Sequence, residues 1–427
     1  MKVLFLSNLY PPIVFGGYER QCHQVATDFV ARGHEVAVLT SNYGGGEAFY
    51  PGQVVYRRLR LFADADDIYR PFEASAEERQ AIAAANQKEL EAVIAAEHPD
   101  VIFAWNLFFV DPSLLDALGG GCPVVYFLSD NWLIAPLNGP FLSRFFQEHV
   151  FGSAPFPPPP VDGGGWCGVP TRWYPPPEQL RVALPQHAIF GAKFVRRLYA
   201  AAGIGFRDSI VIPNGVKLFE MPPDRFTDRT RLINPGELRL LSVGRVVDVK
   251  GVHTAIEALS GLGTGSSQPR IRLTIVGDQQ DRSYQRRLAE LIAETGTAGL
   301  VTFSAAVPED DLFDLFQRHD LYLFPSLYEP FSLILIQALS SGIPTIASDA
   351  GGNTEIVKDR KTGLLFRKGD ARDLVRAIRT LAEQPAMRQA VSEEGRRVAR
   401  GYSSSRQVGE MAQYLEKTAG LGTRTGA

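Results

Sequence analysis

The residues best suited to chemistry follow a short apolar run, Leu321–Phe324, which ends at a proline and predicts a buried strand. One acid, Glu329, lies in the loop after it. Ser332 stands at an expected N-cap, because its hydroxyl can accept a hydrogen bond from an amide of the next turn. The helix is then expected over Leu333–Ser341, since Gly342 and a nearby proline end it.

This order of strand, loop and helix places free backbone amides and the positive end of a helix beside Glu329. A phosphate would be stable there. Glu329 cannot bind the phosphate, because both are negative, but it could accept hydrogen bonds from hydroxyls beside it. A phosphate next to several hydroxyls indicates a sugar nucleotide. The alternative is that Glu329 is a solvated loop acid and that the helix is ordinary core.

Two cations form a second candidate group in one loop between a strand and a helix. Arg245 follows Gly244 at the end of an expected strand, and Lys250 precedes Gly251 and the next helix. Together they could neutralise a diphosphate, because Arg can make a two-pronged contact and Lys a point-charge contact. A solvated basic loop is the alternative.

The first half of the chain offers weaker candidates. Gly16 and Gly17 follow the first expected strand and open a helix, so the backbone could approach a ligand closely there. Parallel sheets bind ligands at the carboxyl ends of their strands. Asp130, at the end of another strand, is a candidate to contact a sugar or an acceptor hydroxyl. The alternatives are a tight strand-to-helix turn for the glycines and a structural N-cap or turn role for Asp130.

The elements that must position these residues alternate between short apolar runs and longer amphipathic ones, which indicates parallel sheets with helices on both faces. Strands are expected at 3–7, 35–40, 54–60, 101–105, 124–128, 189–191, 210–212, 238–243, 271–276, 301–303, 321–324, 345–347 and 364–366. Helices are expected at 18–32, 76–97, 194–202, 252–260, 284–294, 309–318, 333–341, 371–382, 387–400 and 402–417. No GxGxxG follows a strand, so a dinucleotide-binding protein is not indicated.

The length of 427 residues is enough for two domains. We expect a first Rossmann-like domain over 1–215, a polar linker over 216–237, a second Rossmann-like domain over 238–401 and a last helix over 402–418. Prolines, glycines and aromatic residues gather between 136 and 177, so an irregular loop is expected there. Such a loop is either functional or a surface feature without a catalytic role.

The composition, with 45% hydrophobic and 21% charged residues, fits a globular enzyme. A formal net charge of −3 gives no global field that would attract nucleic acid or an anionic bilayer. Three cysteines without metal-like spacing favour a reducing compartment. The N-terminus predicts a strand rather than a secretory signal, and no apolar run approaches the ~20 residues of a membrane helix. We therefore expect a cytoplasmic protein, with peripheral membrane contact left open.

Several short motifs resemble the donor-site signature of family 4 glycosyltransferases of the GT-B fold. They are Gly244-Arg245 with Lys250-Gly251, Pro325-Ser326, Glu329-Pro330-Phe331, Ser341-Gly342-Ile343-Pro344 and Gly351-Gly352. The signature has two glutamates with seven residues between them, and Pro-Phe-Gly after the first. Here Gln337 takes the second glutamate position and Ser332 the glycine position. The family's histidine is also missing near Ser129 and Asp130.

The resemblance implies an α/β protein of the GT-B fold, in which two doubly wound Rossmann-like domains face a central cleft. The last helix would cross back onto the first domain. It also implies a hexosyltransferase that moves a sugar from a nucleotide-diphosphate donor to an acceptor hydroxyl. The reaction would retain the anomeric configuration and need neither a metal ion nor a cofactor. The implied partners are the nucleotide sugar and an unidentified acceptor, with no nucleic acid and no obligate protein partner.

The catalytic candidates are Glu329, Arg245, Lys250 and Asp130. The donor-binding candidates are Gly16, Gly17, Gly244, Arg245, Lys250, Gly277, Val307, Glu329, Phe331, Ser332, Leu333 and Gln337. The cations and the helix amides would stabilise the charge that develops on the leaving nucleotide diphosphate, while Glu329 holds the sugar hydroxyls. In the family, the glutamate equivalent to Gln337 contacts the ribose. Glutamine keeps a carbonyl oxygen there and loses the charge.

Two other functions stay open at this point. Gln337, Ser332 and the missing histidine fit a donor-binding protein without transferase activity, and a sugar-nucleotide epimerase could use a similar two-domain fold. A transferase releases nucleoside diphosphate only when an acceptor is present. A binding protein releases none, and an epimerase converts the donor without an acceptor.

Overall fold

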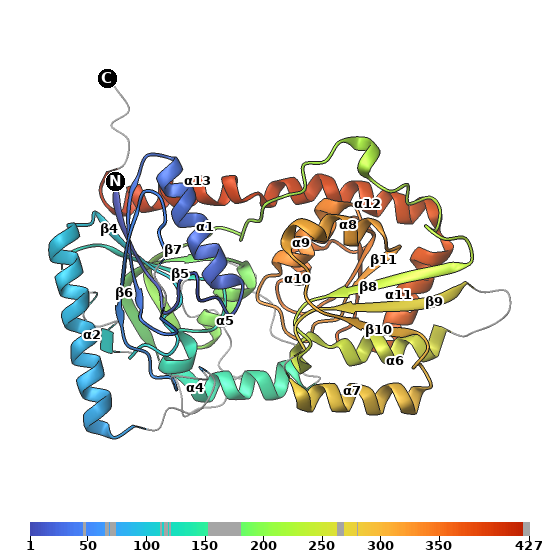
Figure 1. Ribbon diagram of the computed structural model, residues 1–427, viewed down its shortest axis with the longest axis horizontal. Helices are drawn as coiled ribbons and strands as arrows, with labels where there is room; N and C mark the ends of the chain where they lie inside the picture. The colour runs from blue at the N-terminus through green and yellow to red at the C-terminus, as the bar shows by residue number, and fades with distance from the viewer. Residues whose placement is uncertain are drawn as a thin grey trace. The chain divides into compact units, whose positions relative to one another are not determined.

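The computed structural model of the protein describes residues 1–45, 48–64, 68, 74–111, 113–114, 118, 121–152, 181–262, 269–279 and 281–421. These residues form two compact units, each built on one parallel sheet (Figure 1). The first unit comprises the described parts of Met1–Phe146, Ala154–Pro213 and Ser405–Ala427. The second comprises those of Gln147–Ser153 and Asn214–Ser404.

The first unit holds a seven-stranded sheet in the order β3-β2-β1-β4-β5-β6-β7. Its strands are β1 (Lys2–Leu6), β2 (Glu35–Ser41), β3 (Gln53–Leu59), β4 (Val101–Ala104), β5 (Val124–Leu128), β6 (Val182–Phe190) and β7 (Ile204–Val211). Every described pair is parallel. The chain runs outward from β1 to β3 and then places β4 beside β1. The strand order therefore reverses at β1 and β4, which is where such sheets bind ligands.

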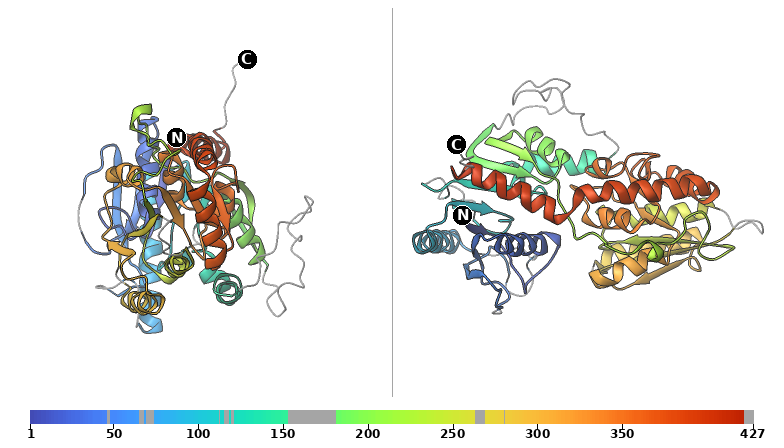
Figure 2. Two further views of the ribbon diagram at one scale, coloured as in Figure 1. Left: turned by 90° about the vertical axis from the view of Figure 1, so that its right-hand side faces the viewer. Right: turned by 90° about the horizontal axis from the view of Figure 1, so that it is seen from above.

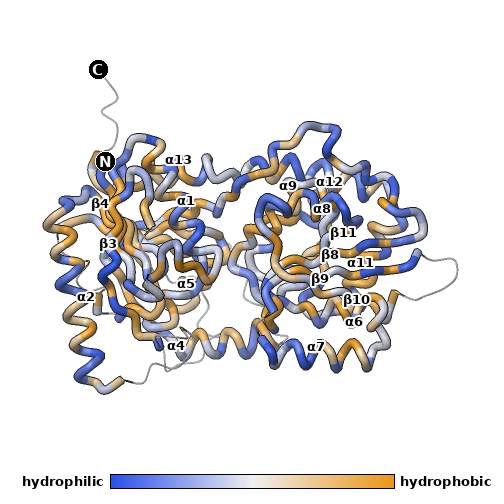
Figure 3. Tube along the Cα trace, viewed as in Figure 1, coloured by the Kyte–Doolittle hydropathy of each residue, from blue (hydrophilic) through white to orange (hydrophobic). Residues whose placement is uncertain are grey.

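The helices packed with this sheet are α1 (Gly17–Ala31), α2 (Ala76–Glu97), α4 (Ile134–Phe145), α5 (Lys193–Ala201) and α13 (Ser404–Thr418). A π-helical turn, Phe146–Val150, continues α4. Residues of opposite hydropathy alternate along α2 (Figure 3). Its start is fixed by a capping box, in which the Ser75 hydroxyl accepts from the Glu78 amide and the Glu78 carboxylate accepts from the Ser75 amide. This local signal explains why the expected bounds of α2 are confirmed.

Aromatic side chains dominate the core of the first unit. Phe5, Phe103 and Trp105 are fully buried and lie in mutual ring contact, with centroids 5.3–6.3 Å apart. The last helix, α13, adds Met411 and Leu415 to the same core. The last helix, drawn in red in Figure 2, is thus part of the first unit's packing.

The second unit holds a six-stranded sheet in the order β10-β9-β8-β11-β12-β13. Its strands are β8 (Glu237–Val243), β9 (Arg270–Val276), β10 (Val301–Ser304), β11 (Leu321–Phe324), β12 (Thr345–Ser348) and β13 (Leu364–Phe366). All described pairs are parallel here too. The strand order reverses between β8 and β11, so the loops after these two strands meet at one edge of the sheet.

Two groups of helices cover the second sheet (Figure 1). The helices are α6 (Val252–Leu262), α7 (Arg282–Thr295), α8 (Leu312–Gln317), α9 (Leu333–Ser341), α10 (Asn353–Ile356), α11 (Ala371–Glu383) and α12 (Pro385–Ala399). Short 3-10 turns lie at η3 (Pro223–Arg225), η4 (Asp248–Lys250), η5 (Glu309–Asp311) and η6 (Arg400–Tyr402). Helix α6 packs on α7 and α11, whereas α9 packs on α8 and α12.

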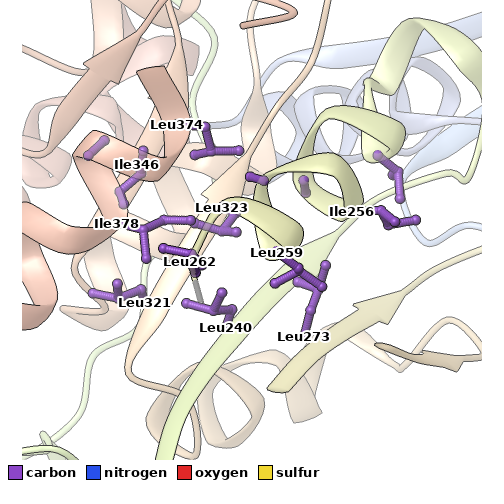
Figure 4. Close-up of a cluster of buried hydrophobic side chains, with 14 of the residues drawn as sticks. Leu240, Ile256, Leu259, Leu262, Leu273, Leu321, Leu323, Ile346, Leu374 and Ile378 are labelled. Atoms are coloured by element: carbon purple, nitrogen blue, oxygen red, sulfur yellow. The ribbon is translucent and has the colours of Figure 1, made fainter. Parts of the chain in front are cut away.

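The core of the second unit is aliphatic. Leu240 and Leu323, from the adjacent strands β8 and β11, pack with Ile256 of α6 and with Leu374 and Ile378 of α11 (Figure 4). All five side chains are fully buried. Each contributes roughly 1.5–3 kcal/mol by leaving water, so this packing holds the strand ends in fixed positions.

Two strands are longer than expected. β6 begins at Val182 rather than at 189, and β7 begins at Ile204 rather than at 210. β6 contains a proline at 185, and the register with β7 shifts between Leu184 and His187, so this irregularity accommodates the proline. β7 is an edge strand with exposed polar residues in its middle, so its sequence lacks a continuous apolar run.

The expectation of an irregular loop from residue 136 onward was wrong for α4, which is helical over Ile134–Phe145. Asn138 leaves helical geometry, with φ −148° and ψ 60°, and Pro140 therefore falls near the start of a new helical segment, where a proline is tolerated. The part of the expected loop from 153 to 177 lies outside the described residues. The expected domain boundaries at 215, 237 and 401 stay predictions.

Candidate active site

The start of α9 is built as the sequence predicts. The Ser332 hydroxyl accepts a hydrogen bond from the Leu335 amide at 3.2 Å, and Gly342 closes the helix in the left-handed region with φ 76°. No acid lies in the first turn. The amides of Leu333 and Ile334 have no acceptor among the residues that the structure describes. This helix end therefore offers unpaired donors and a positive potential to an anion.

Glu329 and Lys250 form an ion pair beside this helix end. Lys250 Nζ donates to Glu329 Oε2 at 2.5 Å, and the two side chains are only 22% and 9% exposed. Lys250 ends η4, just before α6, and Glu329 lies in the β11–α9 loop. The Glu329 backbone carbonyl also accepts from the Gly352 amide at 2.8 Å. The loop after β8 thus holds the Glu329 carboxylate, and the loop after β12 holds its backbone.

Close backbone contacts join these loops. Gly251 has φ 64°, and a Cβ there would lie 2.1 Å from the Pro325 carbonyl oxygen. A Cβ on Gly277 would lie 1.8 Å from the Gly244 carbonyl oxygen. Any side chain at either position would push the loops apart, so glycine is what lets them meet.

The end of β8 carries Arg245 on a well-anchored loop. The Gly244 amide donates to the Val276 carbonyl at 2.9 Å, and the Val246 amide donates to the Asp278 carbonyl at 2.8 Å. Arg245 itself is exposed, and its guanidinium has no partner within the described part of the chain. Because its backbone is fixed and its charge is unpaired among the described residues, the Arg245 side chain is available to bind an anionic ligand.

Three further predicted donor residues lie in this unit. Phe331 is buried, and its ring centroid lies 5.8 Å from that of Tyr402. Val307 lies in the loop after β10. Gln337 is buried in α9 and donates from Nε2 to Glu309 Oε1 at 2.7 Å. Sequence reasoning missed Glu309, because no local pattern marks a contact between residues that lie far apart along the chain.

In the first unit, Gly16 is the N-cap of α1 and Gly17 its first residue. The Gly16 amide donates to Glu19 Oε2 at 2.8 Å, and Glu19 is buried. An acid therefore already occupies this helix end, unlike that of α9. Tyr18 joins α1 to the end of β5, because its hydroxyl donates to the Phe127 carbonyl at 2.6 Å. Glu19 and Tyr18 are neighbours that the sequence analysis did not single out.

Asp130 lies on the same side of the first unit. Its Oδ1 accepts from the Trp132 amide at 2.9 Å. Burial raises the pKa of the Asp130 carboxyl to about 6; the negative charge of Glu19 adds to this rise and the Trp132 amide opposes it. Such a carboxyl can gain or lose a proton close to neutral pH.

The raised pKa of the Asp130 carboxyl predicts how the stability of the fold depends on pH. An unfolded aspartate has a pKa near ~3.9, so at pH values between that and about 6 the folded chain holds the extra proton. The contribution to stability is full at low pH and is lost as the pH rises through this range. At pH 8 we expect the free energy of unfolding of Asp130→Asn to exceed that of wild type by about 2 kcal/mol, because the variant has no charge to bury. This figure is lower than the full pKa shift would give, because the side chain keeps some contact with water.

Urea unfolding of both proteins at pH 4 and pH 8 measures the difference. It should be much smaller at pH 4, where the carboxyl is protonated in the folded wild type and about half protonated in the unfolded chain. Asp278→Asn, at an exposed aspartate, is the matched control and should show no such pH dependence. A difference that stays constant between the two pH values would contradict the assignment.

Two features are absent from the described residues. No described helix combines the length and the apolar composition that a membrane span needs. No group of three or more His, Cys, Asp or Glu side chains in the described residues is placed to hold a metal ion.

Each of the two units matches the model of a known protein family. Residues 224–398 match the family model of glycosyl transferases group 1, and residues 15–218 match that of glycosyltransferase family 4. The chain is 27% identical over 396 residues to a glycogen synthase of Mycobacterium tuberculosis, covering 91% of this chain and 88% of that protein. It is 36% identical over 180 residues to a D-inositol 3-phosphate glycosyltransferase of Nocardia farcinica, covering 41% and 40%.

Solved structures show the same fold. The sucrose-phosphate synthase of Thermosynechococcus elongatus superposes with a TM-score of 0.69 at 19% identity, over 97% of this chain and 98% of that one. An Anabaena protein, Alr3699/HepE, solved with UDP and glucose, superposes with a TM-score of 0.65 at 20% identity, over 98% and 100%. The chain has the GT-B fold and belongs to the family 4 glycosyltransferases, enzymes that transfer a hexose from a nucleotide-sugar donor.

Proposed function

We propose that the diphosphate of the donor lies at the start of α9 and that transfer proceeds with retention of configuration, without a metal ion or cofactor. The observation that carries this proposal is the pair of amides at Leu333 and Ile334, which have no acceptor among the described residues, in a helix whose first turn holds no acid. Lys250 and Arg245 lie in the neighbouring loop, between β8 and α6. Two cations and a helix end together can balance the charge of a diphosphate.

The ion pair between Lys250 and Glu329 suggests how the donor engages the site. Without the donor, each neutralises the other. A bound diphosphate competes with Glu329 for Lys250. The carboxylate is then free to accept hydrogen bonds from hydroxyls of the donor sugar, which fixes the sugar beside the leaving group.

The chemistry then follows from charge. As the bond between the anomeric carbon and the phosphate oxygen breaks, its electron pair stays on the nucleoside diphosphate. Lys250, Arg245 and the α9 amides stabilise that charge. We assign no enzyme nucleophile, so for retention the acceptor hydroxyl must attack from the face the leaving group departs from. The hydroxyl gives its proton to the departing phosphate oxygen as the new glycosidic bond forms.

The first unit supplies the second part of the proposal. Asp130 contacts the sugar or the acceptor hydroxyl, and Gly16 and Gly17 let the backbone approach the ligand closely. UDP-glucose is the first donor to test, because the Anabaena protein that shares this fold has been solved with it. A cytoplasmic location is part of the proposal.

The test begins with a screen of UDP-glucose, ADP-glucose and GDP-mannose by thermal shift, since a bound ligand raises the unfolding temperature. The donor that binds is then incubated with candidate acceptors, and nucleoside diphosphate release is measured with and without each of them. NMR of the anomeric proton in the product reports its configuration. Conversion of the donor without an acceptor, or inversion at the anomeric carbon, would contradict the proposal.

Metal removal is a separate prediction. We expect activity to be unchanged by EDTA, because Lys250, Arg245 and the α9 amides supply the positive charge that Mg²⁺ supplies in other phosphate sites. Initial rates are compared before and after treatment, and after Mg²⁺ or Mn²⁺ is added back. A loss on chelation that either ion restores would show that the diphosphate needs a metal.

A further inference from the structure

A buried glutamine and an exposed acid meet beside the proposed donor site. Gln337 lies on α9 and is only 7% exposed. Its Nε2 donates to Glu309 Oε1 at 2.7 Å. Glu309 opens η5, after β10, and its other carboxylate oxygen has no partner among the described residues. The contact leaves one oxygen of a fixed carboxylate available to a ligand.

The charge around Glu309 limits what that ligand can be. Glu309, Asp310 and Asp311 are consecutive, and none of them forms an ion pair with another described residue. A phosphate would be repelled by three neighbouring carboxylates. A neutral group that donates hydrogen bonds, such as a hydroxyl, would be attracted, since an ionised carboxylate is a strong acceptor.

The position along α9 narrows the choice further. Gln337 comes four residues after Leu333, about 6 Å along the helix axis. If the diphosphate binds at the start of α9, the ribose attached to it can reach this distance along the helix and lie beside Gln337. The Gln337 carbonyl and the open Glu309 oxygen are two adjacent acceptors, which suits the two neighbouring hydroxyls of a ribose.

We propose that Glu309 is the carboxylate that binds the donor's ribose, with Gln337 as the residue that positions it; this inference rests on the diphosphate site proposed above. The resemblance to the family places a glutamate at 337 for this contact. Here the charge stands on Glu309 instead, and the amide of Gln337 makes that arrangement stable. A glutamate at 337 would face Glu309 across the same short distance, and the two carboxylates would repel each other. An acid at 309 therefore requires a neutral residue at 337.

The first experiment measures recognition of single hydroxyls. The nucleoside diphosphate that binds best in the donor screen is titrated calorimetrically, together with its 2′-deoxy and 3′-deoxy forms. We expect wild type to prefer the ribose form over at least one deoxy form by about tenfold or more. Glu309→Gln should reduce that preference to about threefold or less. A role limited to folding would weaken all three ligands equally and leave the preference intact.

Asp310→Asn is the matched control, because it removes a neighbouring exposed acid that does not contact Gln337. It should keep the full preference for ribose. Thermal unfolding of each variant shows whether the fold survives. A wild type that binds the ribose and deoxy forms equally would overturn this inference alone. A wild type that binds no nucleoside diphosphate would overturn both the inference and the diphosphate site.

The second experiment exchanges the two residues. Gln337→Glu alone places two carboxylates face to face and should weaken nucleoside diphosphate binding by about tenfold. The double variant Glu309→Gln with Gln337→Glu restores one acid and one amide, with the charge now on the helix. We expect it to recover most of the lost affinity and of the ribose preference. A double variant no better than Gln337→Glu would overturn the pairing.

Discussion

Lys250→Ala should lower kcat by a factor of about 10²–10³, because it removes a cation aimed at charge that develops only as the leaving group departs. The structure adds a second reason. Lys250 is the partner of Glu329, so without it an uncompensated carboxylate faces the incoming diphosphate. Donor KM should therefore rise together with the fall in kcat. Initial rates over a range of donor concentrations separate the two effects.

Two further variants show whether the charge of Lys250 is what matters. Lys250→Gln keeps a hydrogen-bond donor toward Glu329 but carries no charge, and we expect it to be nearly as impaired as Lys250→Ala. Lys361→Ala removes a lysine from an exposed position in the same unit and should behave as wild type. Wild-type rates from folded Lys250→Ala and Lys250→Gln would remove Lys250 from the diphosphate site.

Local signals in the sequence predict several elements to within a residue. The bounds of α9 follow from Ser332 at its start and Gly342 at its end, and both act as expected in the structure. β5 and β11 are likewise found as predicted, because each is a short apolar run with a clear end. These elements depend on neighbours within one turn or one strand, which is what a local pattern can encode.

Elements that depend on tertiary context were predicted less well. The proline in β6 is tolerated only because the register with β7 shifts beside it. The proline in α4 is tolerated only because Asn138 breaks the helix two residues earlier. Neither adjustment is visible in the sequence, since the same residues would fit an irregular loop equally well.

The contacts within the site follow the same distinction. Glu329, Lys250 and Gln337 were all singled out from the sequence as separate candidates. Their partners could not be predicted, because 79 residues separate Lys250 from Glu329 and 28 separate Glu309 from Gln337. Only the fold brings the loops after β8, β10 and β11 to one edge of the sheet. The sequence thus predicts which residues could act, and the structure shows which of them act in pairs.

Glu329→Gln is expected to have two effects of opposite sign. Glutamine keeps the size of the side chain and one acceptor oxygen but loses the charge. Lys250 is then no longer neutralised and can serve the diphosphate fully, so the nucleoside diphosphate should bind about fivefold more tightly, roughly 1 kcal/mol. Turnover should nevertheless fall by about 10²-fold or more, because the charged acceptor that holds the sugar for transfer is gone. Glu329→Ala should nearly abolish transfer.

Calorimetry with the nucleoside diphosphate and initial rates with the intact donor measure these two effects independently. Glu294→Gln, at an exposed position on α7, is the matched control and should change neither. Only competition between Glu329 and the diphosphate for Lys250 predicts tighter product binding together with slower turnover. If Glu329 served only to hold the loop in place, both affinity and rate would fall together. That result, in a variant that unfolds at the wild-type temperature, would contradict the proposed role of the ion pair.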